Sequence, residues 1–121
     1  MAILNRDQIL TAHDRKTETV VVPEWGGEVL VSVMSGEQRD AYESMITEVD
    51  AKGRAVHKLE NLRAKLVACC VVDESGGLIF SASDITALGR KSASALQRVY
   101  EAAVKLNRVT EDAVEDAAKI S

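Results

Sequence analysis

The side chains that could bind a soft metal ion are two histidines and two cysteines, and their spacing does not favour a metal site. His13 and His57 are far apart in the sequence, whereas Cys69 and Cys70 are adjacent. Structural zinc sites use paired ligands at short fixed spacings, which this set lacks. Neighbouring residues on a helix point about 100° apart, so the two thiols would not converge on one ion. The sequence therefore predicts no metal site and two small buried thiols.

Catalytic patterns are also missing from the sequence. No serine stands in a nucleophile-elbow pattern, and neither histidine has an obvious carboxylate to orient it. The glycines fall in predicted turns rather than in a phosphate-binding motif. The many carboxylates fall at helix starts and on exposed faces, where capping and solubility account for them. We therefore expect a protein that is not an enzyme and that uses no cofactor.

One locally basic segment has the outline of a DNA-binding motif. Residues 84–103, DITALGRKSASALQRVYEAA, read as a short helix, a turn at Gly89 and a second helix, as in a helix-turn-helix. Arg90, Lys91 and Arg98 make it basic, and small polar side chains at the start of its second helix could meet base edges. However, these cations are scattered around the helix, and the flanking sequence is acidic. A small helix-turn-helix regulator is thus an alternative function, and nucleic acid is not the expected partner.

Composition indicates one domain with an aliphatic core. The 121 residues are 46% hydrophobic but only 3% aromatic, so leucine, valine, isoleucine and alanine must fill the interior. The net charge of −4 argues against a protein that coats nucleic acid or anionic membrane. No apolar run approaches the roughly 20 residues of a membrane span, and the first residues do not resemble a signal peptide. We expect a cytoplasmic protein that does not bind membranes.

A β-hairpin is predicted near the N-terminus, at about residues 17–34. Thr17–Val22 is dense in β-branched residues, which favour strands. Gly26 and Gly27 can adopt the positive φ angles of a two-residue hairpin turn. The following residues alternate, and because an isolated two-stranded hairpin is barely stable, their valine face should lie on helices. This face holds Val29, Val31 and Val33, and the opposite face holds Glu28, Leu30 and Ser32.

Helices are predicted along most of the remaining chain. The clearest signal is at residues 35–49, where Ser35 and Gln38 have the spacing of a capping box. Asn5 should cap a short first helix, anchored by the apolar Ile9 and Leu10. Further helices are predicted at residues 56–72, 81–88 and 92–106, and after Thr110. Apolar residues at helical spacing include Tyr42, Ile46 and Val49 in one helix and Leu59, Leu62, Leu66 and Cys69 in another.

Together these elements predict a mainly α (α+β) fold, a small helical domain with one N-terminal β-hairpin. We expect it to span residues 1–121, to be more than half helical, and to contain no sheet larger than the hairpin plus one short strand. The predicted core holds Leu62, Leu66, Val67, Val71, Leu96, Val99 and Ala103.

Two regions could present apolar surface to a partner. Trp25 lies beside the hairpin turn, where it could contact a partner or fold back over the hairpin, and Leu30 lies on the hairpin's second face. The second region is the final helix, whose apolar Val114 and Ile120 could dock on their own domain or on a partner. Trp25, Leu30, Val114 and Ile120 are therefore the candidate partner-binding residues.

The sequence also resembles a known family. The segments concerned are PEWGGEVLVSVMSGEQRDAYE, LRAKLVACCVVDESGGLIFS and SASDITALGRKSASALQRVYEAAVKLNRVTEDAVEDAAKI, which together cover most of the chain from Thr17 onward. In the order of their predicted elements and in their local sequence, they resemble the tail assembly chaperones of long-tailed bacteriophages. This group typically has Leu or Ile followed by Phe, then Ser, Asp and Leu in that order, and finally Leu-Asn.

This resemblance implies a function and a set of partners. Tail assembly chaperones escort the tape measure protein while the tail tube polymerises around it. The resemblance therefore implies binding to the tape measure protein and the tail tube protein, and weak homo-oligomerisation. It also implies that the protein acts in the cytoplasm of the bacterial host and is absent from the mature virion. The family offers no catalytic residues to carry over. Another phage head or tail morphogenesis protein is a further alternative.

Overall fold

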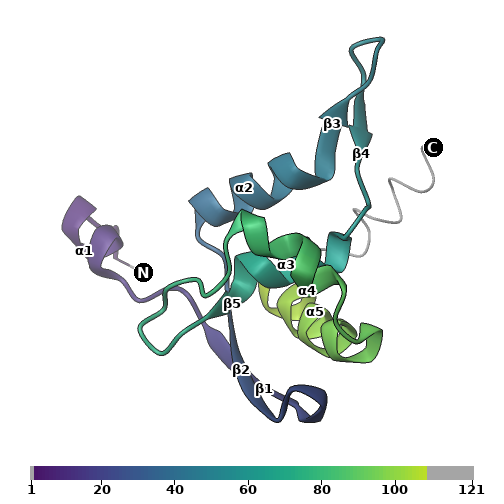
Figure 1. Ribbon diagram of the computed structural model, residues 1–121. Helices are drawn as coiled ribbons and strands as arrows, with labels where there is room; N and C mark the ends of the chain where they lie inside the picture. The colour runs from purple at the N-terminus through teal and green to yellow at the C-terminus, as the bar shows by residue number, and fades with distance from the viewer. Residues whose placement is uncertain (1, 109–121) are drawn as a thin grey trace.

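Residues 2–108, which the computed structural model describes, form a three-stranded antiparallel sheet with helices packed on one face (Figure 1). The strand order is β1 (Thr17–Val22), β2 (Gly27–Ser32) and β5 (Val71–Val72). Helix α5 (Ala93–Asn107) packs on β1 and β2, and α3 (Leu62–Cys70) packs on α5. Of the described residues, 49% are helical and 20% lie in strands. The α+β class with an N-terminal hairpin is confirmed, and the helical share falls just short of the predicted majority.

The pairing of β1 with β2 confirms the predicted valine face. Val20 lies opposite Val29, and Glu18 lies opposite Val31. Side chains alternate between the two faces of a strand, so Val29 and Val31 share the face that α5 covers. Val31 is fully buried. The other face carries Leu30, which lies opposite Thr19.

The turn of this hairpin differs from the prediction. Val22 pairs with Gly27, so the connection is residues 23–26 rather than a two-residue Gly-Gly turn. Proline presets φ for a tight turn, and here a 3-10 helix, η1, spans Pro23–Trp25. Gly26 closes the turn at φ 74°, and its N–H donates to the Pro23 carbonyl at 3.0 Å. The positive φ that only glycine adopts easily is needed at Gly26, whereas Gly27 already belongs to β2.

Helix α2 (Gly36–Ile46) begins as predicted and ends earlier. The Ser35 hydroxyl accepts the Gln38 N–H at 3.1 Å, and the Gln38 side chain accepts the Ser35 N–H at 3.0 Å, which completes the capping box. After Ile46 the chain turns into a second hairpin, β3 (Thr47–Val49) paired with β4 (Ala55–His57). The sequence did not indicate this hairpin, and Val49, predicted on the buried face of a helix, is 69% exposed in a strand.

The turn of the second hairpin is stabilised locally. The Asp50 carboxylate accepts the backbone N–H groups of Lys52 and Arg54, each at 2.9 Å, and pairs with the Arg54 guanidinium at 3.0 Å. Aspartate competes with helix formation by bonding to nearby backbone N–H groups in this way. This local bonding explains why the predicted helical pattern breaks before Asp50.

Helix α3 is shorter than the predicted 56–72 helix, because residues at both ends form strands. Leu59 was predicted on the buried stripe, but it precedes the helix and is 44% exposed. At the other end Val71 pairs with Val31, which makes β5 the one short strand added to the hairpin. The predicted core is confirmed: Leu62 packs against the core cluster from its edge, and Leu66, Val67, Val71, Leu96, Val99 and Ala103 are buried. The cysteines are free and buried, as expected.

The C-terminal helices follow their caps closely. Ser81 and Asp84 form a capping box at the 3-10 helix η2 (Ala82–Asp84), which leads into α4 (Ile85–Gly89). Ser92 caps α5 by accepting the Ala95 N–H at 3.4 Å. Both helices thus begin and end close to the predicted residues. The last predicted helix, with Val114 and Ile120, lies outside the described residues.

The first helix forms at the predicted residues but is not packed on the domain. Asn5 makes a full capping box with Gln8 at the start of α1 (Arg6–Thr11). The expected anchors Ile9 and Leu10 are 56% and 65% exposed, and no residue of α1 is buried. Figure 1 shows α1 standing away from the sheet and the other helices. The prediction that these two residues anchor α1 on the domain is therefore wrong for a single copy of the chain.

Asn107 joins the end of α5 to the junction between β2 and α2. The Met34 N–H donates to Asn107 Oδ1 at 2.6 Å, and Asn107 Nδ2 donates to the carbonyls of Ala103 at 2.9 Å and Ser32 at 3.4 Å. One side chain thereby satisfies backbone groups from a helix and from a strand end that lie far apart in the sequence.

Candidate functional site

The only tryptophan and the only phenylalanine of the chain line one groove. Trp25 comes from η1, and Phe80 follows β5 and the loop after it. Ala87 and Leu88 of α4 complete the apolar lining, and the groove encloses about 440 Å³. The charged side chains that line it are Glu24, Asp84 and Lys91. We call this site the aromatic groove. Sequence reasoning identified Trp25 but missed Phe80, Leu88 and Lys91, although the single occurrence of Phe80 was an available signal.

Core packing fixes the aromatic side chains in this groove. Leu88 is only 5% exposed, and Trp25 and Phe80 are partly buried against the hydrophobic core. Phe80 is brought there by the turn at residues 73–77 and the bridge from Leu78 back to Val72. The aromatic rings therefore sit on a rigid base with one side open.

The indole N–H of Trp25 is buried and has no acceptor within the described part of the chain. A buried donor without an acceptor costs about 1–3 kcal/mol. The apolar lining of Trp25, Phe80, Ala87 and Leu88 suits the groove to a ligand with an apolar side chain.

An ion pair holds the hairpin turn against α5. Arg98 donates both terminal guanidinium nitrogens to the Glu24 carboxylate, with Nη2–Oε2 at 2.6 Å, and Nη1 reaches Oε1. Ser94 Oγ donates to the same carboxylate at 2.9 Å. A bidentate arginine–carboxylate pair is geometrically specific, so Glu24 fixes the adjacent Trp25 relative to α5.

Acid should release this ion pair. Hydrogen bonds from Arg98 lower the pKa of Glu24 from its ordinary 4.5 to about 2. Since the pKa in the folded state is below that of the unfolded chain, the pair stabilises the fold above about pH 4.5. That contribution is lost as the pH falls towards 2. Thermal unfolding of the wild type and of Glu24→Gln across this range tests it. We expect the two melting temperatures to differ at pH 7 and to converge near pH 2, whereas a constant difference would contradict the assignment.

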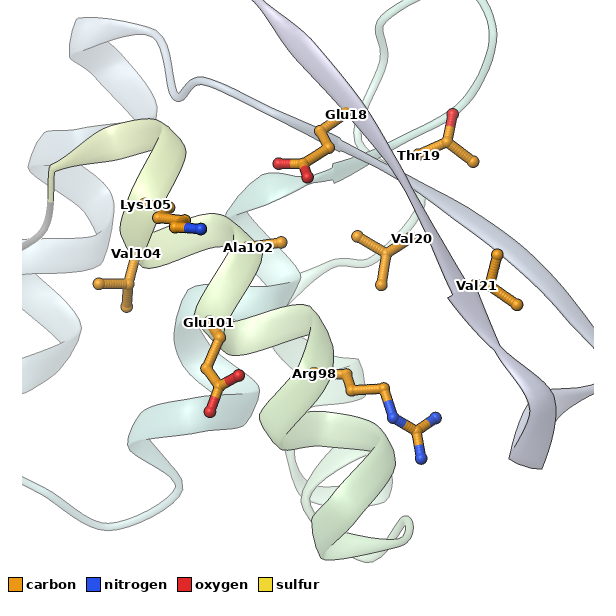
Figure 2. A pocket seen from close by; sticks show the side chains of 9 residues that line it. All are labelled: Glu18, Thr19, Val20, Val21, Arg98, Glu101, Ala102, Val104 and Lys105. Carbon is orange, nitrogen blue, oxygen red and sulfur yellow. The ribbon is translucent and has the colours of Figure 1, made fainter.

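A second hollow of about 560 Å³ lies between the outer edge of β1 and α5 (Figure 2). Figure 2 shows Val20 and Ala102 facing each other across it, with Glu18 and Lys105 towards the end of α5. Arg98 lies at the other end, where Glu24 holds it. This hollow is wide and rimmed by charges of both signs, so it is less suited than the aromatic groove to an apolar ligand.

The structure separates the predicted partner-binding residues. Trp25 lines the aromatic groove, whereas Leu30 lines a third hollow with Thr19, Val72 and Ile79. Val114 and Ile120 lie outside the described residues, so the structure places only two of the four. Among the hollows described within residues 2–108, Trp25 and Leu30 therefore line different ones.

The structure counts against the helix-turn-helix alternative, because it engages Arg98 in an ion pair. The segment does fold as α4 and α5, but Arg98 is engaged with Glu24 rather than available to a base edge.

Within residues 2–108 no group of three or more histidine, cysteine, aspartate or glutamate side chains could hold a metal ion. No helix in that range is long and apolar enough to cross a membrane.

The α+β fold and the aromatic groove define a small binding domain. A family model described as phage tail assembly chaperone matches residues 6–119, and the chain therefore belongs to the phage tail assembly chaperone family. Among solved structures it is similar to the bacteriophage HK97 tail assembly chaperone, with a TM-score of 0.57 and 21% identity. The similarity covers 86% of this chain and 94% of that one. This structural similarity supports the α+β fold of the chain. No individually curated protein matches significantly.

Proposed function

We propose that this protein is a non-enzymatic chaperone that binds the tape measure protein of a long-tailed phage while the tail tube protein assembles around it. Membership of the tail assembly chaperone family, over nearly the whole chain, supports this role. The tube protein is the second proposed partner. Assembly of this kind takes place in the cytoplasm of the bacterial host, and the chaperone is not expected in the mature virion.

The aromatic groove is the proposed contact surface for the tape measure protein. The observation that carries this choice is that Trp25 and Phe80, both unique in the chain, open into the same groove. Aromatic side chains seated in a well-packed pocket contribute much of the energy of protein interfaces. Leu30, Val114 and Ile120 remain additional proposed contacts on other surfaces.

The protein must expose apolar surface to its partner and still stay in solution. Its net charge of −4 favours solubility through mutual repulsion of copies. Weak and reversible self-association would cover the apolar surface when no tail protein is bound. We therefore include a weak homo-oligomer in the proposed function.

A glutamate in the aromatic groove should weaken tape measure binding. Ala87 lines the groove and is exposed, so Ala87→Glu places a charge beside the rings without disturbing the core. We expect the affinity for the tape measure protein to fall at least tenfold in a titration with purified proteins. In co-expression, less tape measure protein should stay soluble. Ala41→Glu is the matched control, because Ala41 is also an exposed helical alanine, on α2.

Two outcomes would contradict the proposal. Equal binding by both variants would remove the aromatic groove from the interface, and no binding by the wild type would remove the tape measure protein as a partner. Sequence-selective binding to duplex DNA at near-physiological salt, lost in Arg90→Ala, would favour the regulator instead. Non-specific binding is expected to disappear as the salt concentration rises.

A further inference from the structure

The N-terminal arm, residues 2–16, carries apolar side chains that the rest of the same chain leaves uncovered. Ile3, Leu4, Ile9 and Leu10 are 98%, 60%, 56% and 65% exposed. Nevertheless α1 has a complete capping box between Asn5 and Gln8. Isolated helices shorter than about 12 residues are marginal in water, so α1 gains most of its stability where its apolar side is docked. These features are those of an element that docks on another surface.

The arm lies away from the aromatic groove of its own chain (Figure 1). Lys16 is already tied to the sheet, because the Val33 N–H donates to its carbonyl at 2.9 Å. Five Cα steps join Thr11, the last residue of α1, to Lys16, and they extend at most about 18 Å. From Thr17 to Val22 strand β1 spans about 17 Å, and the groove lies beyond it at Glu24 and Trp25, so the link gives α1 little room to fold back onto the groove. Figure 1 shows α1 and the hairpin turn at opposite ends of β1. The groove of a second copy has no such limit.

The chemistry of the arm matches that of the groove. Its Ile9 and Leu10 offer adjacent aliphatic side chains to an apolar lining. The arm also holds three basic and two acidic residues, while the rest of the chain holds 12 basic and 17 acidic ones. The net charge of the arm is therefore slightly positive, whereas the net charge of the rest of the chain is negative.

We propose that the arm of one copy docks through Ile9 and Leu10 in the aromatic groove of another copy. This contact deepens the proposed function, because it places self-association on the surface proposed to bind the tape measure protein. The arm then shields Trp25 and Phe80 until the tail protein displaces it. The match of the family model begins at residue 6, so α1 lies within the part of the chain that the family shares.

Complementation between two full-length variants tests the contact. The arm variant, Ile9→Asp with Leu10→Asp, keeps its groove, and the groove variant, Ala87→Glu, keeps its arm. Analytical ultracentrifugation over a concentration series should show that the wild type self-associates and that each variant alone does so at least tenfold more weakly. An equimolar mixture should recover association, because each variant supplies what the other lacks.

Trp25 reports the same event, because it is the only tryptophan. In the wild type, quenching of its fluorescence by acrylamide should weaken several-fold as the protein concentration rises. The arm variant should show no such change. The matched control is Val49→Asp with Val56→Asp, which places two aspartates on exposed apolar positions of the β3–β4 hairpin and should associate like the wild type.

Three results would overturn the inference: a wild type that stays monomeric, an arm variant that associates normally, or a mixture that does not recover. The tape measure titration separates this failure from that of the proposed function. The arm variant should bind the tape measure protein at least as well as the wild type, because its groove is intact and has lost its competitor.

Discussion

Replacing Leu66 with alanine should lower the free energy of unfolding by about 2–5 kcal/mol. Leu66 is fully buried in α3, which packs against α2, α4 and α5. The change removes three carbons from the place where four helices meet, and the surrounding side chains cannot move in freely to fill the space. Urea denaturation followed by circular dichroism measures the loss, with an unchanged m-value as the sign that only stability has changed.

Leu59→Ala is the matched control for this substitution. The sequence pattern assigns Leu59 and Leu66 to the same buried stripe, whereas the structure leaves Leu59 44% exposed ahead of α3. We expect the control to change stability by no more than about 0.5 kcal/mol. Similar losses for both variants would mean that the helix begins near residue 56, as the sequence alone predicts.

Asn107→Ala should destabilise the fold by about 1–3 kcal/mol, because it leaves a buried donor without its acceptor. Met34 is 7% exposed, and its N–H donates to Asn107 Oδ1 at 2.6 Å. The same change removes the bonds from Asn107 Nδ2 to the carbonyls of Ala103 and Ser32. Thermal unfolding should show a lower melting temperature, and the amide of Met34 should exchange its hydrogen faster.

Asn5→Ala provides the control for this asparagine. Asn5 also accepts a backbone N–H, that of Gln8 at 2.9 Å, but it caps the exposed helix α1. Its loss should fray α1 in a monomer and leave the global melting temperature unchanged. If the two alanine variants unfold alike, Asn107 contributes no more than an ordinary helix cap and does not join the two halves of the domain.

The aromatic groove shows how far sequence reasoning reaches towards a binding site. The position of Trp25 beside a tight turn is visible in the sequence, and so is its value for an interface. Its partners are not, because Phe80 and Leu88 reach it only through the β5 bridge and the packing of α4 on α3. Leu30 lies on the face of the sheet opposite Val29 and Val31, as the alternation along β2 already predicts.

The sequence by itself determined the features whose causes lie within a few residues. Capping boxes at Asn5, Ser35 and Ser81 fix where helices begin, and the alternation of β2 fixes which valines face the core, since both depend on local hydrogen bonds and on side-chain direction. Family membership likewise follows from the order of these local signals along the chain.

Only the tertiary structure decided which of several locally reasonable outcomes prevails. The sequence predicts one helix that extends to Val49 and another that begins near Val56, yet these residues form the two strands of the hairpin around the Asp50 turn. Ile9 and Leu10 look like anchors of a packed helix, but the tie between Lys16 and Val33 holds α1 away from the groove that would receive them. Asn107 is the last residue of α5, and its side chain in addition bonds to the end of a strand far away in the chain. The last two outcomes depend on contacts between residues distant in the chain, whose free energies no local pattern contains.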